Sequence, residues 1–119
     1  MTTKEYEVEV ARTVSNNHDS IRARFSVMGI TDLVHAQIGI SGESGEFADA
    51  VKRFLYYGRP LDALNAKEEL GDLLWYIALG AKVLETSIEE LMEDNINKLK
   101  LRYPEKFTEE LAIERKDKQ

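Results

Sequence analysis

The stretch LGDLLWYIALGAKVL, residues 70–84, decides the fold class of this chain. Asp72 and Lys82 are its only charged residues, and its apolar side chains cover nearly the whole circumference of a helix. A helix that is apolar on all sides is normally buried among other helices. Gly71 and Gly80 lower helix propensity by about 1 kcal/mol each, which is tolerated where a neighbouring helix approaches closely. The sequence therefore predicts a long, buried helix within an α-helical protein.

Helical patterning continues on the N-terminal side of this segment. Residues 5–14 fit either a strand, with apolar residues alternating, or a helix. We expect a helix because no partner strand is visible elsewhere. Turn-forming residues predict a loop over 15–20. A second helix is expected to begin near Thr31 or Asp32, either of which could be its N-cap.

Glycine and proline mark the other boundaries. Gly39 and Gly42 are expected to break or kink the second helix, and Pro60 separates it from the buried helix quoted above. The sequence SIEE, residues 87–90, resembles a capping box that opens a last helix, which is expected to end before Pro104. The whole chain is predicted to form an all-α bundle of four or five helices.

Length and composition are those of a single domain over residues 1–119 and bound its function. The core is expected over about 31–107, followed by a C-terminal tail over 108–119. The last six residues of that tail, ERKDKQ at 114–119, are expected to fray. The net charge of −6 disfavours binding to duplex nucleic acid, which needs clustered positive charge. The chain has no cysteine, no apolar run of about 20 residues that could span a membrane and no signal peptide. A cytoplasmic protein is therefore expected.

Two acidic pairs stand among residues that are typical of a core. Glu43 and Glu46 lie three residues apart, as do Glu69 and Asp72, and residues at this spacing share a face of a helix. Each pair is predicted to lie at the edge of a core-facing surface. Most acidic residues are simply exposed to solvent, and Glu69 could be an ordinary first-turn acid. Asp72, a poor helix former inside an apolar run, is harder to explain in this way.

Carboxylates buried side by side require a compensating charge. One unpaired buried carboxylate costs several kcal/mol, and several together also repel. Two helices that each present two acids form an oxygen-rich pocket, which suits a hard divalent cation, Mg²⁺ or Mn²⁺. Di-iron bundles instead use a Glu-x-x-His motif, and neither His18 nor His35 follows a glutamate by three residues. The pattern therefore predicts a Mg²⁺ site rather than an iron site.

Three ordered motifs give the chain a family resemblance: GESGE at 42–46, KEELGDLLWYIA at 67–78 and NINKLKLRYP at 95–104. Over about residues 33–107 the chain resembles the MazG-like nucleoside triphosphate pyrophosphohydrolases of the all-α NTP pyrophosphatase superfamily. It is most similar in kind to the small single-domain versions found in bacteria and phages. That family carries an ExxE motif, a spacer and an ExxD motif, which correspond here to the two acidic pairs.

The resemblance implies hydrolysis of a (deoxy)nucleoside triphosphate to the monophosphate and pyrophosphate, in a house-cleaning or pool-controlling role. All four acids would hold Mg²⁺, and a metal-activated water would attack the α-phosphorus. Either Glu43 or Glu46 would position or deprotonate that water. Homodimers or homotetramers are implied as well, with sites near the subunit contacts. Three residues match the family motif that contacts the nucleotide and its phosphates: Asn95, Lys98 and Arg102.

The basic residues fit this interpretation on charge grounds. A bound triphosphate adds roughly four negative charges to a pocket of carboxylates and Mg²⁺. Further cations are therefore needed, and Lys98 and Arg102 could supply them. Lys52 and Arg53 could also reach phosphate, although a helix-surface role is favoured for both. His35 could touch the base or sugar, although a structural role is favoured.

Two other functions are left open by the sequence. One is a dUTPase-like enzyme with a narrow choice of base. The other is a non-catalytic, regulatory helical oligomer that keeps the fold, which the intact acidic quartet disfavours. Trp75 and Tyr76 are interpreted as core or subunit interface rather than as a base-stacking surface. The helix over 70–84 carries more apolar surface than four short helices can cover, which favours self-association.

Overall fold

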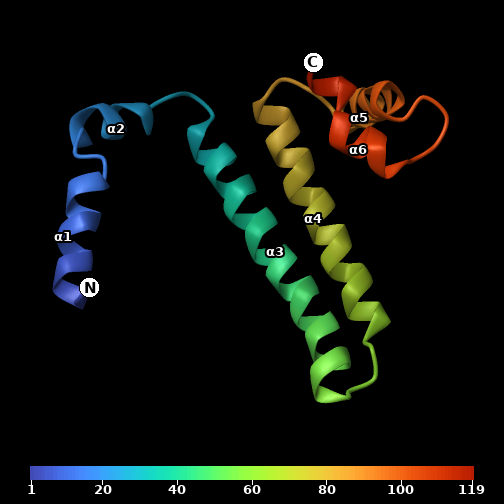
Figure 1. Ribbon diagram of the computed structural model, residues 1–119, viewed down its shortest axis with the longest axis horizontal. Helices are drawn as coiled ribbons and strands as arrows, with labels where there is room; N and C mark the ends of the chain where they lie inside the picture. Colours follow the sequence, from blue (N-terminus) through green and yellow to red (C-terminus); the bar gives the residue numbers. More distant parts are fainter. The chain divides into compact units, whose positions relative to one another are not determined.

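The computed structural model describes residues 1–119 and contains helices but no strand. The all-α prediction is confirmed, although six α-helices form where four or five were expected. None of these helices has the length and hydropathy that crossing a membrane requires. In chain order (Figure 1), the elements are α1 (Thr3–Thr13), α2 (His18–Arg24), α3 (Ile30–Tyr57), α4 (Ala63–Val83), α5 (Ile88–Arg102), α6 (Glu109–Glu114) and the 3₁₀ helix η1 (Lys116–Lys118).

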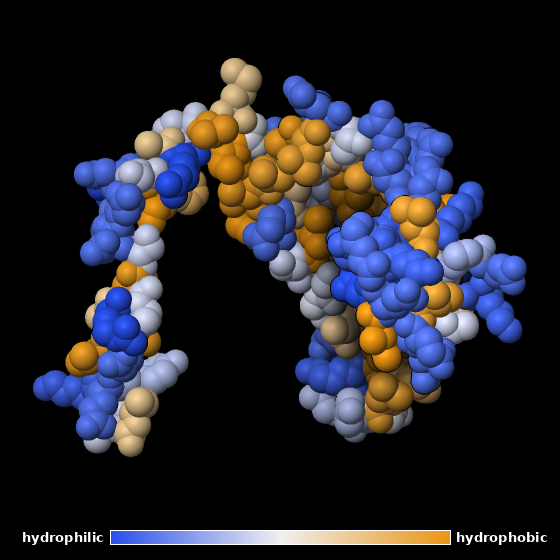
Figure 2. All heavy atoms as spheres, turned by 45° about the horizontal axis from the view of Figure 1, so that its top comes forward, coloured by the Kyte–Doolittle hydropathy of each residue, from blue (hydrophilic) through white to orange (hydrophobic).

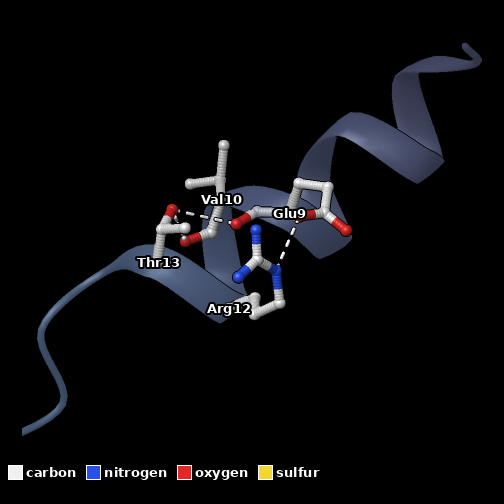
Figure 3. Close-up of polar contacts among 4 residues, drawn as sticks. All are labelled: Glu9, Val10, Arg12 and Thr13. Atoms are coloured by element: carbon white, nitrogen blue, oxygen red, sulfur yellow. Dashed lines mark hydrogen bonds and ion pairs between the residues drawn. The ribbon is translucent and has the colours of Figure 1, made fainter.

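The chain divides into two compact units, Met1–Thr31 and Asp32–Gln119. The first unit holds α1 and α2, and the predicted choice of helix over strand for α1 is confirmed. Within α1, Arg12 Nε donates to Glu9 Oε2 at 2.7 Å, and the Thr13 hydroxyl donates to the Glu9 carbonyl oxygen at 2.9 Å (Figure 3). No residue of α1 is buried. Local hydrogen bonds, rather than packing, therefore define this helix.

The loop predicted over 15–20 is shorter than expected, because α2 already begins at His18. Asp19 lies in the first turn of α2, where a carboxylate interacts favourably with the helix dipole. Its Oδ1 accepts a hydrogen bond from Arg22 Nη2 at 2.5 Å. An acid and a base three residues apart support a helix, and the turn-forming composition of this segment concealed that signal.

α3 runs without interruption from Ile30 to Tyr57, so the predicted break at Gly39 and Gly42 is wrong. Gly39 has a packing role instead, because a Cβ atom at this position would overlap the ring of Tyr76 in α4. The missing side chain lets the aromatic ring lie directly against the α3 backbone. Gly42 has open space around it, and the long helix tolerates its cost of about 1 kcal/mol.

α3 and α4 form an antiparallel hairpin in the second unit (Figure 1). The connection over 58–62, which was predicted, begins with Gly58 in the left-handed region at φ 64°. A residue without a Cβ adopts this conformation at little cost. The connection ends at Asp62, whose carboxylate caps α4 by accepting a hydrogen bond from the Asn65 backbone N at 3.0 Å. The turn is therefore fixed at both ends by its own residues.

α4 is buried on one side only, so the prediction of a helix buried all round is wrong. A Cβ added at Gly80 would lie 3.6 Å from the Cβ of Ala36 in α3, which confirms a close approach there, whereas Gly71 faces open space. Leu74 and Trp75 are 56% and 58% exposed, and hydrophobic side chains lie on the molecular surface (Figure 2). A hairpin covers one side of each helix, so the other apolar face of α4 stays uncovered.

The buried core of the chain is small. No large side chain is fully enclosed. The residues that are buried are three alanines and one glutamate: Ala36, Ala50, Ala81 and Glu69. Small residues along the contact between α3 and α4 let the two backbones approach, and they leave the larger apolar side chains on the outer faces. Surfaces of this kind usually mark contacts with other molecules.

The starts of α3 and α5 agree with the sequence predictions to within one or two residues. α3 begins at Ile30, just ahead of its two predicted caps. α5 begins as predicted after Ser87, whose hydroxyl accepts a hydrogen bond from the Glu90 backbone N at 3.2 Å. The reciprocal half of the capping box is absent, because the Glu90 carboxylate accepts instead from the Thr86 hydroxyl at 2.6 Å. The Glu90 carboxylate thus pairs with the Thr86 hydroxyl rather than with the Ser87 backbone N–H that a capping box would use.

The last residues, 114–119, include the 3₁₀ helix η1, which contacts α5, so the prediction that they fray is wrong. α5 ends before Pro104 as expected, and both α6 and η1 then contact α5. Arg102 Nε and Nη2 each donate to one carboxylate oxygen of Asp117 at 2.7 Å, and the Asp117 side chain is 0% exposed. The hydrogen bonds from Arg102 lower the pKa of Asp117 to about 2. This bidentate pair ties the end of the chain to α5.

Candidate metal centre

Three carboxylates from the two helices of the hairpin converge on one point. Glu43 comes from the middle of α3, and Glu69 and Asp72 come from the first half of α4. One carboxylate oxygen of each lies within 4.8 Å of the other two. Glu69 and Asp72 share a face of α4 because they lie three residues apart, and the antiparallel α3 places Glu43 beside them. Three of the four predicted acids thus form one cluster, which we call the acidic trio.

Burial differs among the members of the acidic trio. Glu69 is 7% exposed, Glu43 is half-buried and Asp72 is exposed. The expectation of a buried acid is therefore met at Glu69 and wrong at Asp72, which is exposed although it lies beside Glu43 of α3. The Oε2 atoms of Glu43 and Glu69 are buried and have no hydrogen-bond partner. A buried polar atom without a partner costs free energy, so these two oxygens need a proton or a cation.

The pKa of Glu69 reflects the lack of a positive charge within the acidic trio. It is raised from 4.5 to about 7, first by hydrogen bonding with the Glu43 carboxyl group, then by burial, then by the negative charges of Glu46 and Glu43. Two ionised carboxylates this close repel each other, and a proton on one of them removes the repulsion and lets it donate to the other. A divalent cation between the oxygens would neutralise the same repulsion and would displace the proton.

Glu46, the fourth predicted acid, lies beside the acidic trio rather than within it. Its side chain is exposed, and together with Glu69 it lines a cavity of about 530 Å³. Its negative charge contributes to the raised pKa of Glu69, so the two carboxylates are near neighbours. The structure therefore separates the four acids into three that meet and one that faces the adjoining cavity.

The acidic trio fits a hard divalent cation. Its ligand atoms are carboxylate oxygens, which Mg²⁺ and Mn²⁺ prefer. Two ligands of one Mg²⁺ lie at most about 4.2 Å apart, since each bond is about 2.1 Å long. The observed limit of 4.8 Å lies close to that separation, so small side-chain rotations would suffice. No histidine belongs to the group, so the structure contains no Glu-x-x-His arrangement at this site.

Aromatic residues border the acidic trio on the side of Asp72. A cavity of about 350 Å³ is lined by Glu43, Asp72, Trp75 and Tyr76. The Trp75 and Tyr76 rings pack edge to face with centroids 5.0 Å apart, and the His35 ring lies 5.5 Å from that of Tyr76. His35 therefore supports the wall of this cavity and is not a ligand of the cluster. The exposure of Trp75 shows that it is not a core residue.

Residues 35–107 of the chain match the family described as the MazG nucleotide pyrophosphohydrolase domain. The chain belongs to the MazG family. A relative, the Gene 37 protein of Mycobacterium phage L5, is 35% identical over 80 residues, which cover 61% of this chain and 68% of that protein. No solved structure matches the chain. The resemblance given by the sequence motifs is thereby confirmed, and the MazG match includes every member of the acidic trio.

The α5 residues of the MazG match belong neither to the acidic trio nor to the walls of the cavities beside it. Asn95 and Lys98 are exposed, and neither lines the two cavities that contain the acids. Arg102 is engaged by Asp117 through both of its donors. The guanidinium that the sequence assigns to phosphate is thus occupied by a carboxylate that sequence reasoning did not consider.

Sequence reasoning also missed the residues that shape the surroundings of the MazG site. Gly39 and Tyr76 set the close contact between the two helices, and each lies four residues from a member of the acidic trio. That spacing of one helical turn was the available signal. Arg59 and Asn65 line a cavity of about 560 Å³ at the α3–α4 connection. Nothing local in the sequence indicates that these two residues meet.

Proposed function

We propose that this MazG-family protein hydrolyses (deoxy)nucleoside triphosphates to the monophosphate and pyrophosphate in a Mg²⁺-dependent reaction. The observation that carries the proposal is the pair of buried, unpartnered carboxylate oxygens on Glu43 and Glu69, inside a matched MazG domain. Family membership supports nucleotide pyrophosphohydrolase chemistry. The oxygen-only ligand set supports Mg²⁺, with Mn²⁺ as a substitute of similar chemistry.

Each acid has a distinct part in the proposed reaction. Glu43, Glu69 and Asp72 hold the ion. When bound, Mg²⁺ would screen the phosphate charges and lower the pKa of a coordinated water. Glu46, which faces the adjoining cavity, accepts the proton of the attacking water. The water oxygen forms a bond to the α-phosphorus while the bond from that phosphorus to the bridging oxygen breaks, and pyrophosphate leaves with the bonding electrons.

Self-association into a homodimer or homotetramer is part of the proposal. Leu74 and Trp75 are more than half exposed on the uncovered face of α4, and a second copy would cover such a face. Lys98 is exposed and lines neither cavity beside the acidic trio of its own chain. In an oligomer, Lys98 of one copy could approach the acids of another and add the positive charge that a triphosphate needs. Sedimentation of the full chain measures the number of subunits directly.

Release of pyrophosphate from a panel of dNTPs and NTPs, with Mg²⁺ and with a chelator, tests the catalytic part. We expect turnover with Mg²⁺, loss of turnover with chelator, and loss of activity in Asp72→Asn. Glu68→Gln is the matched control, because Glu68 is an exposed acid of α4 outside the trio. Turnover of dUTP alone would indicate the dUTPase-like alternative. A chain that turns over no nucleotide would refute the proposal and favour a non-catalytic oligomer.

A further inference from the structure

The α3–α4 connection holds a basic cavity next to the acidic one. This cavity of about 560 Å³ is lined by Arg53, Arg59 and Asn65 among others. The cavity of about 530 Å³ that contains Glu46 and Glu69 shares Arg53 and Asn65 with it. Shared wall residues mean that the two cavities adjoin. A ligand that contacts the acidic end can therefore extend directly toward the two arginines.

The positive charge of this basic cavity is only partly neutralised within the chain. Arg53 Nη2 lies 2.7 Å from Asp49 Oδ2, with 62% of the Arg53 side chain exposed. The Arg59 side chain takes part in none of the ion pairs or hydrogen bonds of the structure. Asp62, the other acid in the wall, is used as the cap of α4. Arg59 is thus a cation beside a cavity, and its charge has no assigned partner.

The backbone that carries Arg59 is held in place. Gly58 turns the chain at φ 64°, and the Arg59 backbone N donates to the Arg53 carbonyl oxygen at 3.2 Å. This bond keeps the two arginine positions together on one short loop. Lys52, the neighbouring cation, lines neither cavity, and its Nζ lies 3.4 Å from Asp49 Oδ1 and 5.7 Å from the centroid of the Tyr57 ring.

We propose that Arg53 and Arg59 form the subsite for the terminal phosphates of the nucleotide, the part that leaves as pyrophosphate. This inference rests on the proposed function. Guanidinium groups bind phosphate oxygens in pairs of charge-assisted hydrogen bonds. The cavity on the opposite side of the acidic trio has carboxylates and aromatic rings in its walls and no cation. Of the cavities beside the trio within one chain, only those toward Arg53 and Arg59 therefore offer a polyphosphate chain complementary charge.

Calorimetric titration of the full chain with inorganic pyrophosphate, and separately with a dNMP, both in Mg²⁺, tests the subsite. We expect Arg59→Ala to weaken pyrophosphate binding roughly tenfold or more, as loss of a charge-assisted hydrogen bond does, and to leave dNMP binding unchanged. Arg59→Lys keeps the charge but loses the paired donors, so it is expected to fall between wild type and Arg59→Ala. Lys67→Ala is the control, because Lys67 is exposed and lines neither cavity.

Several outcomes would overturn the inference. They are no binding of pyrophosphate by wild type, equal pyrophosphate affinity in Arg59→Ala and Lys67→Ala, or equal loss of pyrophosphate and dNMP binding in Arg59→Ala. Circular dichroism confirms that each variant is folded. The two proposals fail separately. If the protein turns over no nucleotide but binds pyrophosphate in an Arg59-dependent way, the hydrolase proposal is refuted and an anion subsite remains. If turnover is normal and Arg59→Ala does not change pyrophosphate binding, only the subsite is refuted.

Discussion

Two buried carboxylates of this protein are held in opposite ways. The Asp117 side chain is fully buried against Arg102, and its pKa is lowered to about 2. Glu69 is 7% exposed among other acids, and its pKa is raised to about 7. One charge finds its partner inside the chain and the other does not.

The difference separates a structural from a functional use of the same chemical group. A buried charge that is fully paired within the fold has no need of a ligand, and its role is to hold two segments together. A buried charge that is surrounded by like charges costs stability unless something from outside neutralises it. Asp117 is accordingly part of the scaffold, and Glu69 belongs to the proposed metal site.

Removing the charge of Glu69 gives the largest expected effect. Glu69→Gln loses a proposed metal ligand worth several kcal/mol of transition-state stabilisation, so we expect activity to fall by roughly 10²–10³-fold. The metal-free variant is expected to melt at a higher temperature than metal-free wild type, because a buried charge without a partner is gone. Pyrophosphate release and thermal melts in chelator measure the two effects. A variant that is both active and less stable would contradict the comparison.

Removing the charge of Asp117 is expected to lower the stability of the fold, whereas removing that of Glu69 is expected to raise it. Asp117→Ala leaves the half-buried Arg102 without its partner, so we expect the melting temperature to fall by several degrees and the tail to become sensitive to protease. Asp94→Ala is the control, since that aspartate is exposed on α5. If the melting temperature of Asp117→Ala equals that of the control, the bidentate pair does not stabilise the fold.

The contact between α3 and α4 at Gly39 determines how the acidic trio is held. Gly39→Ala places a methyl group where the Tyr76 ring lies, and we expect overpacking to cost about 1–3 kcal/mol of unfolding free energy. Gly71→Ala faces open space and should gain up to about 1 kcal/mol through helix propensity. Urea unfolding of both variants distinguishes these signs. Equal effects would show that the glycine at 39 has no packing role.

The two carboxylates also predict opposite pH dependences of stability. In metal-free protein, the pKa of Glu69 is about 7 against 4.5 in the unfolded chain, so its contribution is full below pH 4.5 and is lost as pH rises through 7. The contribution of Asp117 is present above pH 3.8 and is lost as pH falls through 2. We expect the melting temperature in chelator to decrease modestly between about pH 5 and pH 8, and added Mg²⁺ to remove that decrease. No change with either pH or Mg²⁺ would contradict the assignment of Glu69.

The sequence predicted most of the helices because their signals are local. Periodicity over 70–84, the cap at Ser87 and the stops at Pro60 and Pro104 each act within a few residues, and the structure confirms them. The spacing of the acidic pairs likewise placed Glu69 and Asp72 on one face. It could not show that Asp72 is exposed, because exposure depends on which side of α4 the hairpin covers.

Contacts between distant segments account for the predictions that were wrong. Asp117 meets Arg102 across fifteen residues, and no local pattern marks that pair. Gly39 was interpreted as a helix breaker because an isolated glycine weakens a helix, whereas the Tyr76 ring requires a glycine there. In each case the sequence showed the residue type correctly but not its partner.

The contact between Gly39 and Tyr76 would bear on which ions the proposed metal site selects. Gly39 lies one turn before Glu43 in α3, and Tyr76 lies one turn after Asp72 in α4, about 6 Å along each helix. The depth to which the ring sinks onto the glycine fixes the distance between the helices, and with it the gap between the carboxylates. Discrimination by ionic radius would then originate in two residues that carry no ligand atom, and a single added methyl group would widen the gap toward larger cations.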